Sequence, residues 1–229
     1  MMKDIFTSEL NIEEKKCKIL HNPLDIKLIK RQSLEKISEK HKKLLQDDYF
    51  LQVSRLVYEK NLLELVEIYK KLKEIGIKEK LYIIGEGEER IKLEENIKKL
   101  GLEADVLLLG ELKNPYPFFK NAKLFLHTST SEAFGMVLIE SMIFGVPVFA
   151  YDSPIGPSDI LGKNSENGVL IPLHDKKKYV KKIIEILEDK NIYKKYKEKG
   201  FKRANDYSLE KISNQLDKVL KGMLEKNKV

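Results

Sequence analysis

The sequence has 229 residues, of which 42% are hydrophobic, so the chain can bury a sizeable core. Its single cysteine, Cys17, excludes an internal disulfide, and no cysteine and histidine residues have zinc-site spacing, which favours a reducing, cytoplasmic setting. The formal charge is +7, but lysines and glutamates alternate along helical patterns such as KKYKEKGFKR, which is typical of a solvated surface. We therefore expect no nucleic-acid partner.

The N-terminal residues MMKDIFTSEL lack the apolar segment of a signal peptide. No apolar run reaches the roughly 18 residues that a membrane-spanning helix needs. We therefore expect neither a secreted nor an integral membrane protein, although the positive charge is compatible with peripheral contact with the inner face of a membrane.

The first predicted unit, residues 1–46, is rich in charges. It contains the break HNPLD at 21–25 and one long, lysine-rich amphipathic stretch, 26–45. This composition indicates a linker or the remnant of a neighbouring domain rather than a domain with its own core.

From Tyr49 onward, short apolar runs alternate with helical patterns, which is typical of a parallel sheet with crossover helices. The runs expected to form strands are 49–54, 80–85, 105–110, 123–128, 146–150 and 168–172. Helical spacing is found at 61–75, 87–100, 135–144, 155–161, 175–188, 191–205 and 208–222. We predict an α/β fold with a doubly wound, Rossmann-like parallel sheet of about six strands over 47–205, followed by a C-terminal helix within 206–229.

In such a sheet, ligands bind at the carboxyl ends of the strands. The first strand is followed by Ser54-Arg55-Leu56, and Lys60 comes five residues after Arg55. Only four of the 43 basic residues are arginines, so an arginine at this edge is informative. A guanidinium grips phosphate oxygens in two places and a lysine adds a point charge, so the pair suits a diphosphate. Either residue could instead be an ordinary surface cation.

The segment SEAFGMVLIESMIFGVPVFAYD, residues 131–152, places Glu140 within an otherwise apolar helical pattern. A carboxylate there needs a partner, either a structural one or the two hydroxyls of a ribose. Glu132, in the preceding loop, could bond a sugar hydroxyl or could only complement the helix dipole. The helix is expected to open at Phe134-Gly135-Met136, whose free amides would form an anion site.

A third candidate loop, Gly85-Glu86-Gly87, follows the second strand. A glycine pair alone marks any tight turn. The dinucleotide fingerprint needs three glycines after the first strand, and no Walker-type phosphate loop occurs, so the pattern argues against NAD-binding and ATP-binding proteins.

Together these motifs resemble family 4, or group 1, of the retaining glycosyltransferases, which have the two-domain GT-B architecture. The resemblance runs from about His21 to the C-terminus. In SEAFGMVLIE, Glu132 and Glu140 match the family's glutamate pair, which implies contacts with the donor sugar and the ribose, respectively. Arg55 and Lys60 match its diphosphate-binding pair, although Ser54 replaces the more usual glycine.

The resemblance also assigns the remaining nucleotide contacts. IGEGEER at 84–90, with Gly85 and Gly87, looks like the loop beside the base, and Gly110-Glu111-Leu112 would have a similar role. IGPSDIL at 155–161 is similar to a segment frequent in members that use UDP-hexoses or UDP-N-acetylhexosamines, which favours a UDP-sugar.

The implied activity is transfer of a sugar from a nucleoside diphosphate to a saccharide or lipid-linked acceptor, with retention, and with Arg55, Lys60 and Glu132 as the catalytic side chains. No Asp-x-Asp motif is present, which fits metal-independent departure of the diphosphate and no cofactor. In the family, an N-terminal domain before HNPLD binds the acceptor, so we expect that domain in a longer polypeptide or a partner chain.

Three other hypotheses stay open at this stage. The chain could be a binding module that holds a nucleotide sugar without transferring it, or a subunit completed by another polypeptide. It could also belong to a sugar-nucleotide epimerase of similar architecture, which would need an acid and base pair across the cleft.

Overall fold

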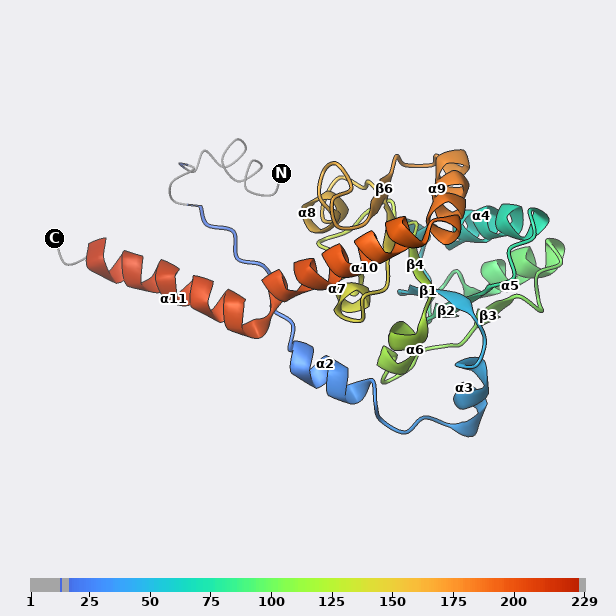
Figure 1. Ribbon diagram of the computed structural model, residues 1–229, viewed down its shortest axis with the longest axis horizontal. Helices are drawn as coiled ribbons and strands as arrows, with labels where there is room; N and C mark the ends of the chain where they lie inside the picture. Colours follow the sequence, from blue (N-terminus) through green and yellow to red (C-terminus); the bar gives the residue numbers. More distant parts are fainter. Residues whose placement is uncertain (1–12, 14–16, 227–229) are drawn as a thin grey trace.

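The computed structural model describes residue 13 and residues 17–226, and in this part of the chain six parallel strands form one sheet (Figure 1). The strands are β1 (Tyr49–Val53), β2 (Lys80–Ile84), β3 (Val106–Leu108), β4 (Leu124–His127), β5 (Val148–Tyr151) and β6 (Val169–Ile171). Their order is β3-β2-β1-β4-β5-β6. This is the doubly wound, Rossmann-like order, so the predicted fold class is confirmed.

Helices cover both faces of the sheet. One face packs against α4 (Leu62–Glu74), α5 (Arg90–Lys99) and α9 (Lys176–Glu188). The opposite face packs against α2 (Ile26–Gln32), α3 (Glu39–Leu44), α6 (Tyr116–Asn121), α7 (Met136–Ile143) and α8 (Pro157–Leu161). Helix α10 (Lys190–Ala204) lies against both α7 and α9.

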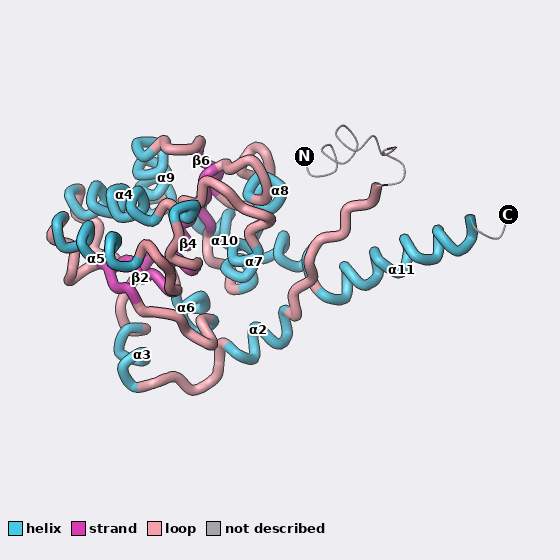
Figure 2. The backbone as a smooth tube through the Cα atoms, turned by 180° about the vertical axis from the view of Figure 1, so that it is seen from behind, coloured by secondary structure: helices cyan, strands magenta, loops and turns pink. Residues whose placement is uncertain are grey.

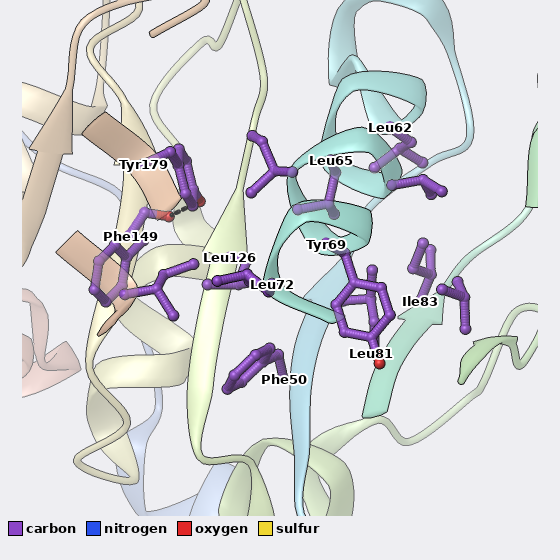
Figure 3. Packing of buried hydrophobic residues seen from close by; sticks show 14 of the residues in the cluster. Phe50, Leu62, Leu65, Tyr69, Leu72, Leu81, Ile83, Leu126, Phe149 and Tyr179 are labelled. Atoms are coloured by element: carbon purple, nitrogen blue, oxygen red, sulfur yellow. Dashed lines mark hydrogen bonds between the residues drawn. The ribbon is translucent and has the colours of Figure 1, made fainter. Parts of the chain in front are cut away.

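The core consists of two hydrophobic clusters, one on each face, because successive side chains of a strand point to opposite sides. In β1, Phe50 joins the α4 side, while Tyr49 and Leu51 join the α7 side, and all three are fully buried. Figure 3 shows the first cluster, with Phe50 and Tyr69 packed between the sheet and α4. Burial on both faces explains the continuous apolar runs of the sequence.

The N-terminal part and the region after β3 contain helices that were not predicted. The amphipathic stretch 26–45 forms two helices, α2 and α3, since Ser33 ends the first and the Ser38 side chain caps the second. Helix α6 has no counterpart among the predicted helices, because six residues with Pro115 before them and Pro117 within them carry little helical periodicity. The division of the chain at residues 46 and 205 stays a prediction.

The two ends of the described chain leave the sheet domain at one place. Leu24 and Ser208 form a parallel bridge, and the turn η3 (Asn205–Tyr207) leads into α11 (Leu209–Lys226). Both views show α11 extending away from the sheet (Figures 1 and 2). Among the described residues, no helix is both long enough and apolar enough to cross a membrane.

Candidate functional site

The strand order reverses between β1 and β4, so a crevice between loops is expected at the carboxyl ends of these two strands. These neighbouring strands lie at the centre of the sheet, and the chain proceeds from β1 toward β2 but from β4 toward β5. The loops that follow them therefore diverge to opposite sides, which is where open α/β sheets bind ligands. The segments 54–61 and 128–135 occupy this position.

The loops after the first three strands are bonded to one another. The amide of Leu56 donates to the carbonyl of Glu86 at 2.8 Å, and the amide of Glu89 donates to the carbonyl of Leu56 at 2.9 Å. The amide of Gly85 donates to the carbonyl of Gly110 at 2.9 Å. The structure thus brings three of the predicted loops together at one edge.

Gly85 and Gly87, the two predicted glycines of the loop after β2, lie so close to the backbone of residues 54–56 that a side chain at either position would overlap with it. A Cβ atom on Gly85 would lie 1.8 Å from the carbonyl oxygen of Ser54, and one on Gly87 would lie 2.3 Å from that of Leu56. Real Cβ atoms almost never come within 3.0 Å of another heavy atom. The glycine pair therefore fixes the segment that carries Arg55.

Arg55 presents an unpaired guanidinium at this edge. Its side chain is exposed, and it makes no side-chain hydrogen bond or ion pair within the part of the chain that the structure describes. Arg90, by contrast, is bonded to Glu86 and Glu94 of its own helical segment. Arg55 is thus available for an anion.

Lys60 is held in place by the loop that follows β4. It ends the short helix η2 (Tyr58–Lys60), and the hydroxyl of Thr128 donates to its carbonyl at 3.0 Å. The hydroxyl of Ser129 and the amide of Thr130 donate to the carbonyl of Glu59 at 3.1 and 2.8 Å. These bonds fix η2 against residues 128–130.

The result is a close ion pair between two predicted site residues. Lys60 Nζ lies 2.5 Å from Glu132 Oε1, and the side chains are 15% and 10% exposed, respectively. His127 Nε2 lies 2.8 Å from the same oxygen. Burial raises the pKa of Glu132, but the hydrogen bonds and charges of His127 and Lys60 outweigh it and lower that pKa to about 2. Glu132 is therefore a fixed negative charge.

Sequence reasoning missed the buried polar groups behind this pair. His127 is fully buried, and its Nδ1 lies 3.4 Å from Gln52 Oε1, while Gln52 Nε2 donates to Ser54 Oγ at 3.2 Å. The signal that could have found them is a polar residue within each of two otherwise apolar central strands.

Helix α7 begins at Phe134-Gly135-Met136, as predicted, with Gly135 as the N-cap and Met136 as the first helical residue. Gly135 precedes the helix with φ of 93°, which favours glycine, and no acidic residue lies in the first turn. The Phe134 ring stacks on His21 at 5.0 Å and meets Tyr207 edge-on. The amides at this helix start are thus positioned by the segments through which the chain enters and leaves the domain.

Glu140 lies one turn further along α7 and has a different environment from Glu132. It is half-buried, and the hydroxyl of Tyr116 donates to its Oε1 at 3.2 Å. Burial raises the pKa of Glu140, and the Tyr116 hydrogen bond only partly offsets this. Tyr116 was missed because it belongs to the unpredicted helix α6.

Glu111 and Leu112, two further predicted residues, follow β3 on the loop bonded to Gly85. Glu111 is exposed, and Leu112 packs partly buried against the α7-side cluster. Two hollows lie elsewhere, one of about 470 Å³ along α4 and α9 and one of about 450 Å³ between α3, α5 and β3. Within the described ranges, no group of three or more His, Cys, Asp or Glu could hold a metal ion. The absence of a metal requirement stays a prediction.

Comparison with known proteins identifies the family. A family model described as glycosyl transferases group 1 matches residues 33–203. The chain is 35% identical, over 212 residues, to N-acetylgalactosamine-N,N'-diacetylbacillosaminyl-diphospho-undecaprenol 4-alpha-N-acetylgalactosaminyltransferase of Campylobacter jejuni, and the match covers 93% of this chain but 55% of that protein. The chain thus spans about half the length of this curated relative.

Solved structures agree with this result. One is Staphylococcus aureus TarM in a complex with UDP, with 29% identity and a TM-score of 0.69, covering 74% of this chain and 34% of that one. Another is a glycosyltransferase from Rickettsia africae, with 20% identity and a TM-score of 0.82, covering 97% of this chain and 61% of that one; this likeness concerns the fold alone. Since the family match spans most of the sequence, the chain belongs to the group 1 glycosyltransferases.

Proposed function

We propose that this chain forms the donor-binding half of a retaining glycosyltransferase and holds a nucleoside-diphosphate sugar, with a UDP-sugar favoured. The observation that carries the proposal is the convergence of Arg55, the Lys60–Glu132 pair and the start of α7 at one edge of the sheet. Among the described residues, no group of three or more metal-ligating side chains accompanies them. Two cations and free helix amides suit a diphosphate.

The proposed chemistry is stabilisation of the leaving group. As the bond between the sugar and the diphosphate breaks, negative charge builds on the phosphate oxygens. Arg55, Lys60 and the amides at 134–136 would oppose that charge from backbone segments that the fold positions at this edge. Retention at the anomeric carbon is taken from the family resemblance.

Glu132 would bind the transferred sugar, and Glu140 would bind the ribose of the nucleotide. Glu132 stays ionised and can accept a hydrogen bond from a hydroxyl of the transferred sugar. Glu140 lacks a cationic partner in the described chain, and two ribose hydroxyls would satisfy its half-buried carboxylate. The UDP preference draws support from TarM, whose structure holds UDP.

The acceptor is proposed to be a saccharide or lipid-linked saccharide, bound by another domain or a partner chain. The Campylobacter relative is named for a diphospho-undecaprenol acceptor, which supports a substrate at a membrane surface. Peripheral contact with the cytoplasmic face of the membrane would follow. A catalytically incomplete nucleotide-sugar-binding module, or a subunit that needs a separate acceptor domain, is the second candidate.

Titration of the purified chain with UDP, GDP and ADP tests the proposal. We expect one nucleotide to bind selectively by calorimetry, equally well with Mg²⁺ and with EDTA. Arg55→Ala and Glu140→Ala should each weaken binding by about tenfold or more, as expected for lost contacts to charged groups. Arg31→Ala, which removes an exposed guanidinium on α2, is the matched control and should bind as the wild type does.

Two results would contradict the proposal. If the wild type binds none of the three nucleotides, or if Arg31→Ala weakens binding as much as Arg55→Ala, the site is not a nucleoside-diphosphate site. Binding that disappears in EDTA would contradict metal independence alone.

A further inference from the structure

Lys60 is needed in two places, because it neutralises Glu132 in the structure and is proposed to bind the diphosphate. Lys60 Nζ and His127 Nε2 both contact Oε1 of Glu132, and no other side chain in the described residues bonds to this carboxylate. A diphosphate needs the charge of Lys60, whereas a carboxylate only 10% exposed needs a partner of its own. If Lys60 turned to a phosphate without a replacement, Glu132 would be left as a poorly solvated charge.

His127 is placed to be that replacement and cannot itself follow the ligand. Its ring is fully buried, its backbone amide donates to the hydroxyl of Tyr179 at 3.0 Å, and its Nδ1 faces Gln52. Tyr179 is itself anchored on the carbonyl of Phe149 at 3.1 Å (Figure 3). The imidazole is thus fixed from behind, with only Nε2 directed at Glu132.

We propose that His127 is a positioning residue that holds Oε1 of Glu132 while Lys60 is engaged by the diphosphate, so that Lys60 can move to the phosphate and Glu132 stays in place for the sugar. The inference rests on the proposed function and deepens it by naming what frees Lys60. His127 acts through Glu132 and does not touch the nucleotide.

Two substitutions of His127 by amide residues distinguish a positioning role for its Nε2 from a role in packing alone. His127→Gln places an amide where Nε2 lies and can still donate to Glu132, whereas His127→Asn keeps the polar group beside Gln52 but is too short to reach Glu132. We expect His127→Asn to weaken UDP binding by about tenfold or more and His127→Gln to bind within about threefold of the wild type. Melting temperatures of both variants verify that they fold.

The decisive measurement repeats the comparison in a Glu132→Gln background. There the ion pair is absent and Lys60 is free, so His127→Asn should no longer weaken UDP binding. A merely structural histidine would lower affinity equally in both backgrounds. The inference is overturned if the loss persists in the Glu132→Gln background, or if the Asn and Gln variants at position 127 bind alike.

The two proposals fail in different ways. If the wild type binds UDP and Arg55→Ala weakens it, but His127→Asn does not, the positioning role is wrong and the proposed function stands. If the wild type binds none of UDP, GDP and ADP, both are wrong.

Discussion

Replacement of Gly87 by alanine tests whether the loops after β1 and β2 really lie in contact. An added Cβ would lie 2.3 Å from the carbonyl oxygen of Leu56 and 2.7 and 2.8 Å from its carbonyl carbon and amide nitrogen. All three are backbone atoms, so no side-chain rotation can relieve the overlap. The two loops must separate.

The expected cost follows from what separation breaks. The bonds between Leu56 and Glu86 and between Glu89 and Leu56 would lengthen or be lost. Two backbone hydrogen bonds contribute about 0.5–1.5 kcal/mol each, and overpacking costs about 1–3 kcal/mol. We therefore expect a loss of about 2–6 kcal/mol in the free energy of unfolding, which for a chain of this size lowers Tm by about 4–24 °C. Arg55 lies in the displaced loop, so UDP affinity should fall as well.

Calorimetric melting and UDP titration measure both effects. Gly222→Ala is the matched control, because a Cβ there meets nothing within 4 Å and the position lies inside α11. It should leave UDP affinity unchanged and, by helix propensity, should not lower the free energy of unfolding. A Gly87→Ala variant that loses less than about 1 kcal/mol and binds UDP normally would refute the close approach of the two loops.

The pKa of Glu132 is lowered and that of Glu140 is raised, so the two glutamates should contribute to stability with opposite dependences on pH. The pKa of Glu132 is lowered from 4.5 to about 2, so its contribution, on the order of 3 kcal/mol, is complete above pH 4.5 and is lost as pH falls toward 2. Denaturant unfolding should show Glu132→Gln less stable than the wild type at pH 7, with the gap narrowing in acid; a constant gap would contradict this. The pKa of Glu140 is raised, so its contribution is lost as pH rises, and Glu140→Gln should be the more stable protein at pH 7 but not below pH 4.5. A variant less stable at pH 7 would show that the Tyr116 contact outweighs burial.

The sheet and its loops could be predicted because their signals are local. Strands buried on both faces produce continuous apolar runs, and these runs located all six strands within about two residues. Arg55 and the Gly85 and Gly87 pair stand directly after such runs, so the topology alone predicts that they share an edge. The fold class and family were therefore accessible from the sequence.

Most partners of the site residues could not be predicted, because they come from distant segments. Tyr116 reaches Glu140 across 24 positions, and Gln52 faces His127 across 75. Nothing in the local sequence of Tyr116 marks it, since its short helix has little periodicity. The contact between Tyr116 and Glu140 depends on how α6 and α7 pack, which only the tertiary structure shows.

The structure also changes how the predicted residues should be regarded, because the sequence presents Lys60, Glu132 and Glu140 as three separate contacts. Lys60 and Glu132 are one electrostatic unit, so the cationic charge offered to a phosphate depends on the protein contacts of the neighbouring carboxylate. The two glutamates are alike in sequence but opposite in electrostatics, because one accepts from a lysine and a histidine and the other from a single phenol. The difference in partners therefore suits Glu132 to a fixed polar contact and Glu140 to hydroxyl donors.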